Sequence, residues 1–258
     1  MDHNTPTGAV CGPDGCDIPA DGASDPAQSL PLAPAAATSR IDIVSDAICP
    51  WCWVGKRNLE AALAMLAAEG ERFEIFWRPF QLNPDMPAAG VERAAYRAAK
   101  FGNETRGREL DAQVAAAGHA AGLAFRHDRM LRTPNTIDAH RLVRLAGEQG
   151  PARQDAVMEA VFQAYFHDGR DIGSQAVLAE IAGEAGLDAA AVAAYLASEA
   201  GADEVRAEDA GFRQGGLSGV PTFALDGHVL FSGAMPPGQI AAAFRRGLGI
   251  LRERAKAA

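Results

Sequence analysis

The sequence predicts an α/β fold that is interrupted by a long all-helical segment. Residues 41–44 and 73–77 have strand character and lie on either side of an apolar helical repeat, which indicates a β-α-β unit. Nearly every window between residues 91 and 212 has apolar residues at helical spacing, and a second β region follows only at residues 222–231. One sheet is therefore expected to be completed by strands far apart in the chain.

The first part of this fold is the β-α-β unit, which we place within residues 40–90. A β-branched run ends at Ser45, and leucines then recur at helical spacing until Gly70, a helix stop signal. Between residues 72 and 78, apolar and charged side chains alternate with the period of two that is typical of a strand with one buried face. A crossover of this kind implies parallel strands with the helix packed on the sheet.

The helical insertion is expected over residues 91–215, and the last part of the fold over residues 216–258. Within the insertion, Ser174 and Asp188 stand where N-caps are expected, because their side-chain oxygens can accept from unpaired first-turn N–H groups. In the last part, the turn Asp226-Gly227 between two apolar runs predicts a β-hairpin. An amphipathic helix then closes the chain.

Composition and charge narrow the classes of function. With 48% hydrophobic and 22% charged residues the chain has an ordinary globular composition. The net charge of -9 without a basic cluster argues against nucleic-acid binding and against an anionic membrane surface. No run of 18 apolar residues occurs, and the N-terminus lacks the features of a secretory signal, so a cytoplasmic protein is expected, either a monomer or a homodimer.

Residues 1–39 are expected to be a disordered acidic tail. They contain no Lys or Arg, five Asp and six Pro, so they cannot assemble a core. The tail carries a cysteine pair, Cys11 and Cys16, whose glycine-rich flanks permit a small-loop disulfide. Three interpretations stay open: an auxiliary redox pair that exchanges with Cys49, metal capture by the tail thiols, or a pair without a catalytic role.

The run Cys49-Pro50-Trp51-Cys52 lies at the junction of the first strand and its helix. A helix N-terminus favours an anion, so the thiolate of Cys49 is stabilised there. Cys52 follows one turn later on the same face and can attack a mixed disulfide formed at Cys49. Pro50 suits the first helical position, and Trp51 adds apolar surface that should tune the redox poise. The alternatives are half of a structural zinc site and a chance pair of buried cysteines.

A second feature, Gly219-Val220-Pro221, comes directly before the second β region. An X-Pro bond adopts the cis form at low cost, so a fixed kink beside an active site is expected here. In a thioredoxin fold the proline in this place is cis and packs against the dithiol. The alternative is an ordinary trans proline at the start of a strand.

Six runs occur in a consistent order between residues 40 and 254: Ser45 to Lys56, Trp77 to Pro84, Asn135 to His140, Ala164 to Phe166, Gly219 to Phe223, and Ser232 to Ala234. Together they resemble the FrnE-type branch of the DsbA-like thiol–disulfide oxidoreductases. The resemblance implies a thioredoxin fold with a large all-helical insertion. It also implies that Cys49 is the nucleophile, Cys52 the resolving thiol and Pro221 the cis-proline. The tail pair is not part of the match.

Relatives of this fold include 2-hydroxychromene-2-carboxylate isomerases and kappa-class glutathione transferases, which use a serine in the place of Cys49. Because Cys52 would tend to discharge a glutathione adduct, the two cysteines favour dithiol redox chemistry over glutathione-dependent isomerisation or transfer. The expected partners are protein or small-molecule disulfides and thiols. No cofactor or metal is expected, with glutathione as a co-substrate. A zinc-stabilised interaction module that uses all four cysteines is the non-enzymatic alternative.

The substrate groove is predicted to include Val220, and by resemblance Arg78, Asn135 and His140 also face the dithiol cleft. A cation there would favour the thiolate or bind an acidic group. The alternatives are structural. Asn135 or Thr136 would cap the helix after Pro134, His140 would be a partly buried helix residue, and Arg78 would be a charge at a strand edge.

Overall fold

The computed structural model describes residues 38–257, apart from the side chain of Glu104. Cys11 and Cys16 lie outside these residues. The interpretations of the tail and of its cysteine pair therefore stay predictions.

A four-stranded mixed sheet has the strand order β2-β1-β5-β6. Its strands are β1 (Thr38–Ser45), β2 (Arg72–Pro79), β5 (Thr222–Leu225) and β6 (His228–Ser232). Two helices belong to the same part of the fold, α1 (Pro50–Ala68) and α9 (Pro237–Ala257). The crossover through α1 makes β1 and β2 parallel, whereas β5 is antiparallel to both β1 and β6. Positive φ angles of 45° at Asp226 and 80° at Gly227 make the tight turn of the hairpin. The predicted β-α-β unit and β-hairpin are confirmed.

The segment between β2 and β5 is mainly helical. It contains α2 (Arg93–Phe101), α3 (Glu104–Ala120), α4 (Ile137–Gly147), α5 (Pro151–Gln163), the π-helix η1 (Ala164–Asp168), α6 (Gln175–Glu184), α7 (Ala189–Ala197) and α8 (Ala202–Gln214). Ser174 and Asp188 accept from first-turn N–H groups of α6 and α7, as predicted. The segment also contains an antiparallel pair, β3 (Val91–Glu92) and β4 (Arg132–Thr133), whose two-residue strands are too short for a period-two pattern.

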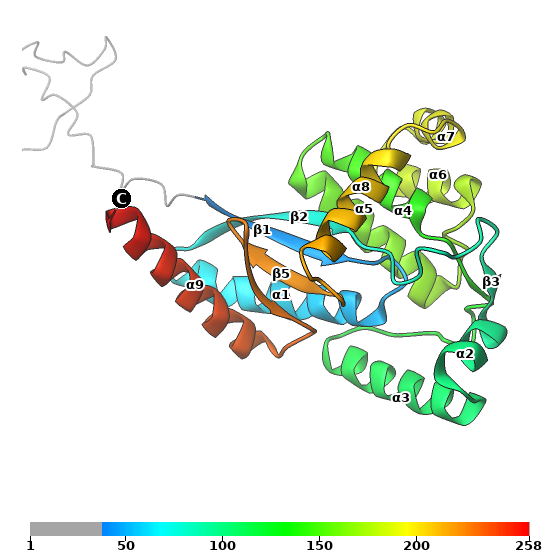
Figure 1. The fold of residues 1–258 in the computed structure, drawn as a ribbon, viewed down its shortest axis with the longest axis horizontal. Helices are drawn as coiled ribbons and strands as arrows, with labels where there is room; N and C mark the ends of the chain where they lie inside the picture. The colour runs from blue at the N-terminus through cyan, green and yellow to red at the C-terminus, as the bar shows by residue number, and fades with distance from the viewer. Residues whose placement is uncertain (1–37, 258) are drawn as a thin grey trace, which may run out of the picture. The chain divides into compact units, whose positions relative to one another are not determined.

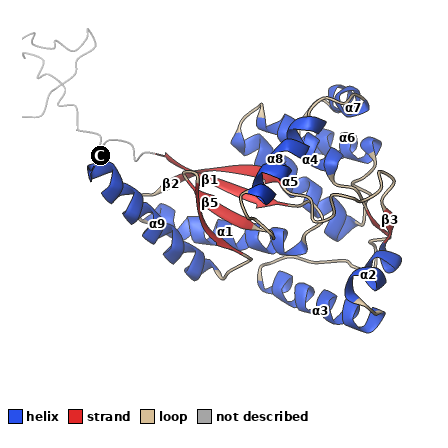
Figure 2. Cartoon of the chain, viewed as in Figure 1, coloured by secondary structure: helices blue, strands red, loops and turns tan. Residues whose placement is uncertain are grey.

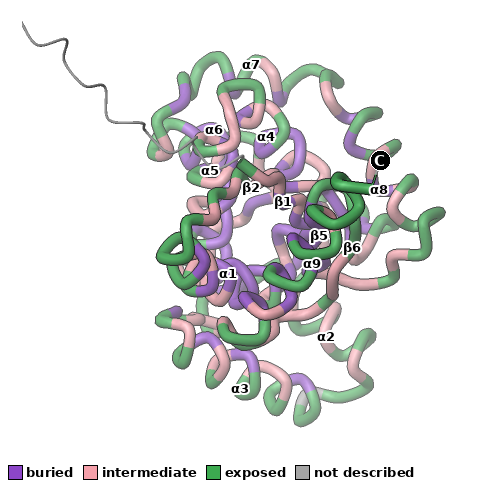
Figure 3. The backbone as a smooth tube through the Cα atoms, turned by 90° about the vertical axis from the view of Figure 1, so that its left-hand side faces the viewer, coloured by how far each residue is buried: buried purple, intermediate pink, exposed green. Residues whose placement is uncertain are grey.

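Helices lie against both faces of the sheet (Figure 1). α1 and α9 pack together on one face, whereas α4, α5 and α8 gather around β2. Figure 2 shows α2 and α3 beyond the end of the sheet at which α1 begins. In Figure 3 the buried residues follow α1, the central strands and α4 to α6, whereas much of α3 and α7 is exposed. The core thus lies where α1, the sheet and the insertion meet.

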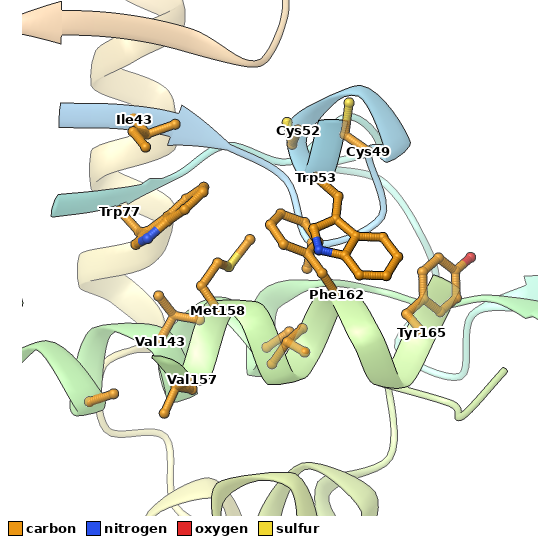
Figure 4. Close-up of a cluster of buried hydrophobic side chains, with 14 of the residues drawn as sticks. Ile43, Cys49, Cys52, Trp53, Trp77, Val143, Val157, Met158, Phe162 and Tyr165 are labelled. Atoms are coloured by element: carbon orange, nitrogen blue, oxygen red, sulfur yellow. The ribbon is translucent and has the colours of Figure 1, made fainter. Parts of the chain in front are cut away.

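An aromatic cluster joins the first turn of α1 to the insertion (Figure 4). The ring of Trp53 stacks on Phe162 and Phe166 and meets Phe125 edge to face, with centroid distances of 5.3 to 6.3 Å. Phe162 also packs edge to face against Trp77 of β2. Because aromatic side chains bury large apolar areas, this cluster fixes α5 and η1 beside the start of α1.

Polar contacts from α5 hold the same two tryptophans. The indole of Trp53 donates to Glu159 at 3.1 Å, and the indole of Trp77 donates to Asp155 at 2.9 Å. The ammonium group of Lys56 lies 3.2 Å from the carboxylate of Asp155 and 3.3 Å from that of Glu159. Although burial opposes the charge of Lys56, the neighbouring carboxylates raise its pKa. Lys56 therefore stays charged, and its charge is balanced by carboxylates of α5 and by Glu60 of α1 itself.

The outer edge of β2 is closed by Gln154 of α5. Its side-chain oxygen accepts from the backbone N–H of Trp77 at 2.9 Å, and its amide nitrogen donates to the carbonyl of Trp77 at 3.2 Å. The side chain thus takes the place of a neighbouring strand at this residue.

α1 passes close to the start of β5 at Gly55. A Cβ atom at this position would lie 3.0 Å from Cγ of Pro221 and 3.3 Å from the ring of Phe223. The Val220–Pro221 peptide bond is cis, as the sequence predicts. Because glycine has no side chain, Gly55 lets α1 lie directly against this proline.

Replacing Gly55 by alanine should destabilise the protein. The added methyl group would press on Pro221, and overpacking of this kind costs about 1–3 kcal/mol in free energy of unfolding, which urea unfolding measures. Gly249→Ala is the matched control, because a Cβ at this position in α9 meets no atom within 4 Å. It should leave stability unchanged or raise it by up to about 1 kcal/mol. Equal stability of Gly55→Ala and the parent protein would contradict the close contact.

Candidate active site

The two cysteines lie at the N-terminal end of α1, with both sulfurs close to that end (Figure 4). Cys49 is the N-cap in an extended conformation, Pro50 is the first helical residue, and the N–H of Cys52 donates to the carbonyl of Cys49 at 3.0 Å. Both are free thiols, with 4% of Cys49 and none of Cys52 exposed. The predicted placement of the dithiol at a strand-to-helix junction is confirmed.

Asp46 organises the turn that leads into the dithiol. Its backbone carbonyl accepts from the N–H of Cys49 at 3.0 Å. Its buried carboxylate accepts from the N–H of Leu82 at 2.7 Å, which ties the turn to the residues that follow β2. Asp46 thus links the turn before Cys49 to the segment that follows β2, at the same end of the two parallel strands.

The loop before β5 meets Cys49 from the opposite direction. The thiol of Cys49 donates to the carbonyl of Val220, with 3.7 Å between Sγ and the oxygen, although the two residues are 171 positions apart. Within this loop, the hydroxyl of Thr222 donates to the carbonyl of Gly219 at 2.9 Å. The structure thus brings the dithiol, Val220 and the cis-proline together, as the sequence predicts.

The surroundings of the two thiols distinguish their chemistry. Burial raises the pKa of Cys52 well above its usual range, and the hydrogen bond and charge of Cys49 raise it further. Ser45 and the backbone at Asp46 act in the opposite direction but do not reverse the shift. Cys52 therefore keeps its proton. Cys49 is the cysteine of the pair that lines the neighbouring cavity.

A cavity of about 370 Å³ opens beside Cys49. Pro50, Trp51 and Val220 form the wall on the dithiol side, and Trp51 is 39% exposed. Residues of α2 and α3 and of the nearby loops complete the lining, and the charged or titratable ones among them are Arg93, Tyr96, Arg97, Lys100, Asp111, His127 and Tyr165. This basic wall was not predicted from the sequence. The available signal was the spacing of the three α2 cations, which puts them on one face of a helix.

Arg78 lies in another part of the molecule. It lines a separate cavity of about 320 Å³ together with residues of α4 and α8. Its guanidinium group donates to Asp42 at 2.6 Å and to Glu208 at 3.1 Å. The expectation that Arg78 faces the dithiol cleft is wrong, because its charge is paired with these two acids.

Asn135 and His140 are not among the described residues that line the cavity beside Cys49. Asn135 donates to the carbonyl of Met86 at 2.6 Å and accepts from the N–H of Ile137 at 2.9 Å, so it acts at the start of α4, as the structural alternative has it. Nε2 of His140 lies 3.4 Å from the buried carboxylate of Asp46. His140 therefore contacts the turn before the dithiol and lines the separate cavity at Arg78. The expectation that it faces the dithiol cleft is also wrong.

Neither a metal-binding cluster nor a membrane-spanning helix occurs in the part of the chain that the structure describes. Within residues 38–257, no three His, Cys, Asp or Glu side chains are grouped so that they could hold a metal ion. None of the helices in this range combines the length and apolar character needed to cross a membrane. The zinc hypothesis involves Cys11 and Cys16 and stays a prediction.

The stability of the reduced protein should fall at alkaline pH because of Cys52. Its folded pKa is raised, so its contribution to stability is full below the unfolded thiol pKa of about 8.5 and is lost as the pH rises toward the folded value. Over that interval the free energy of unfolding should fall by up to about 1.4 kcal/mol per pH unit.

Urea unfolding of the reduced protein at a series of pH values measures this slope, and Cys52→Ala is the control. The variant should lose the part of the slope that Cys52 causes. It keeps the contribution of Tyr165, whose pKa burial raises to about 12. Identical slopes in the two proteins would contradict the raised pKa of Cys52.

Comparisons with known proteins agree with this geometry. The model of the DSBA-like thioredoxin domain matches residues 40–245. The structure of a "probable DsbA oxidoreductase" from Streptomyces coelicolor is 36% identical, with a TM-score of 0.73, and the match covers 82% of this chain and 90% of that one. The "Uncharacterized protein YwbO" of Bacillus subtilis (strain 168) is 26% identical over 194 residues, which are 75% of this chain and 90% of that protein.

A more distant likeness concerns the fold alone. The structure of a 2-hydroxychromene-2-carboxylate isomerase is 16% identical, with a TM-score of 0.62, and the match covers 85% of this chain and 99% of that one. The matched family model spans most of the chain, including both cysteines of the dithiol and the cis-proline. The protein belongs to the family of DsbA-like thioredoxin domains.

Proposed function

We propose that the protein is a thiol–disulfide oxidoreductase that exchanges electrons through Cys49 and Cys52. The observation that carries the proposal is the placement of Cys49, which caps α1 and lies 3.7 Å from the carbonyl of Val220, with the buried Cys52 one turn behind it. Membership of the DsbA-like family supports it. Assignment to the FrnE-type branch and a cytoplasmic location stay predictions from the sequence.

The exchange proceeds in two steps. The thiolate of Cys49 attacks one sulfur of a disulfide, forms a mixed disulfide and releases the other half of the substrate as a thiolate, which takes up a proton. Cys52 then loses its proton and attacks the sulfur of Cys49, which releases the second half as a thiol. One disulfide is reduced to two thiols while Cys49 and Cys52 are oxidised to a disulfide. The reverse sequence oxidises a dithiol substrate.

The raised pKa of Cys52 gives the two steps their order. Part of that shift comes from the charge and hydrogen bond of Cys49. Once Cys49 is bound in a mixed disulfide its negative charge is gone, so the pKa of Cys52 falls and the second attack becomes easier. Burial, the larger cause of the shift, persists in the mixed disulfide, so the pKa of Cys52 stays raised, although by less.

A glutathione-dependent isomerase or transferase is the second candidate. The cavity beside Cys49 has a volume suited to a small molecule, and the likeness to the isomerase lies in the fold. Cys52 favours the first candidate, because it can displace glutathione from Cys49. We therefore treat glutathione as a thiol co-substrate of the exchange.

Serine variants of the two cysteines test the proposal. Disulfide reduction and oxidative refolding should fall to background in Cys49→Ser, because the attacking sulfur is absent. Cys52→Ser should still attack but accumulate a mixed disulfide that mass spectrometry detects. Undiminished activity of Cys49→Ser would refute the proposal.

The double variant Cys11→Ser/Cys16→Ser is the control outside the dithiol. It should keep full activity if the tail pair has no catalytic role, and it should lose turnover if the pair relays electrons to Cys49. A Cys52→Ser protein that lost disulfide exchange but catalysed a glutathione-dependent isomerisation would favour the second candidate.

A further inference from the structure

We propose that Arg93, Arg97 and Lys100 form an anion subsite beside Cys49, which selects low-molecular-weight disulfides that carry carboxylates. The inference rests on the proposed dithiol chemistry of Cys49 and adds the class of substrate. We call these three residues the α2 cation row.

The cation row and the reactive sulfur line the same cavity. Its volume of about 370 Å³ lies in the range of small-molecule sites, and Cys49, Val220 and residues of α2 all line it. A disulfide held at Cys49 can therefore extend its other groups toward the cation row without leaving the cavity. A ligand of this size is a small disulfide or a short peptide segment.

The cavity has an excess of positive charge. Arg97 and Arg93 both reach the same carboxylate oxygen of Asp111, at 3.0 and 3.5 Å. Among the described side chains, Lys100 contacts neutral groups, the side-chain oxygen of Asn83 at 3.2 Å and the hydroxyl of Tyr96 at 2.5 Å. Asp111 is the one acidic residue among the described residues that line the cavity. The described lining of the cavity therefore carries three cations and one carboxylate, although the net charge of the chain is -9.

The arginines are largely removed from solvent, so this excess is costly. The side chains of Arg93 and Arg97 are only 14% and 18% exposed. Burial lowers the pKa of Arg97, and the charge of Arg93 adds to this effect against the attraction of Asp111. A buried cation needs a partner of opposite charge, and a ligand carboxylate would supply the second one.

His127 does not explain the charge pattern. Its Nε2 lies 3.7 Å from Asp111, but burial lowers its pKa, and Arg93 and Arg97 reinforce that shift against Asp111 and Asp128. His127 is therefore neutral at physiological pH and leaves the cation row to set the charge of the cavity.

Arg97 is also held in a fixed orientation. Its guanidinium group stacks 4.8 Å over the ring of Phe101 and donates to the carbonyl of Gly107. A guanidinium group that is already oriented loses less side-chain entropy when it binds a carboxylate. Arg97 is thus the best placed member of the row for specific recognition.

Three disulfides of similar length and different charge test the subsite: dithiodipropionate with two carboxylates, neutral bis(2-hydroxyethyl) disulfide, and cationic cystamine. Each oxidises the reduced protein in a single turnover, and every rate is divided by the rate with free dithiothreitol to cancel intrinsic reactivity. We expect dithiodipropionate to be favoured over the neutral disulfide by about tenfold or more. Cystamine should be disfavoured, and added salt should weaken both preferences.

Variants locate the effect. Arg93→Gln and Arg97→Gln should each reduce the preference for dithiodipropionate by about tenfold while the rate with the neutral disulfide stays the same. Lys100→Gln, at an exposed position of α2, tests the row if an arginine variant fails to fold. Arg106→Gln is the control, because this arginine of α3 is 54% exposed and lies outside the cavity. Two results would overturn the subsite. One is a preference among the three disulfides that equals that of dithiothreitol, and the other is a preference that Arg97→Gln and Lys100→Gln leave unchanged.

A binding measurement separates this inference from the proposed function. Suberate has the chain length of dithiodipropionate but cannot exchange disulfides, so calorimetry reports the anion site without redox chemistry. Binding to the parent protein that weakens about tenfold in Arg97→Gln would support the subsite even if no disulfide oxidised Cys49. Absent binding, or equal affinity for both proteins, would overturn it even if all three disulfides reacted.

Discussion

The contact between α1 and the start of β5 is the constraint on which the active site depends. Because Gly55 has no side chain, α1 can lie against Pro221, and this approach brings the carbonyl of Val220 to Cys49. α1 follows β1 in the sequence, whereas Pro221 comes directly before β5, which follows the insertion. β5 pairs with β1 and so brings Pro221 back to α1. The reactive centre is thus assembled by the completed sheet rather than by the dithiol run itself.

The insertion contributes on the other side of α1. Trp53 follows Cys52 directly and is held by Phe162 and Phe166, so the first helical turn is packed between β5 and the insertion. The same segment supplies α2, whose basic residues line the cavity at Cys49. One inserted segment therefore both anchors α1 and lines the cavity at Cys49.

Local signals were sufficient for much of the fold and for the centre of the site. Asp226-Gly227 specified a turn, Ser174 a helix start, and the dithiol a strand-to-helix junction, because each depends on the chemistry of a few neighbouring residues. The cation row was missed, since its spacing predicts a shared helix face but not what that face meets. The alternation of apolar and charged residues in β2 places Trp77 and Arg78 on opposite faces of the strand. It could not show that Asp42 and Glu208 pair with Arg78. Those answers depend on tertiary packing.

Gln154 has a consequence for how this protein meets other chains. An uncovered strand edge invites a foreign strand to add to the sheet, which is a route to aggregation. At Trp77 both backbone groups of β2 are already bonded to the amide of Gln154, so an incoming strand would first have to displace it. The described fold therefore resists the addition of a foreign strand at this part of β2.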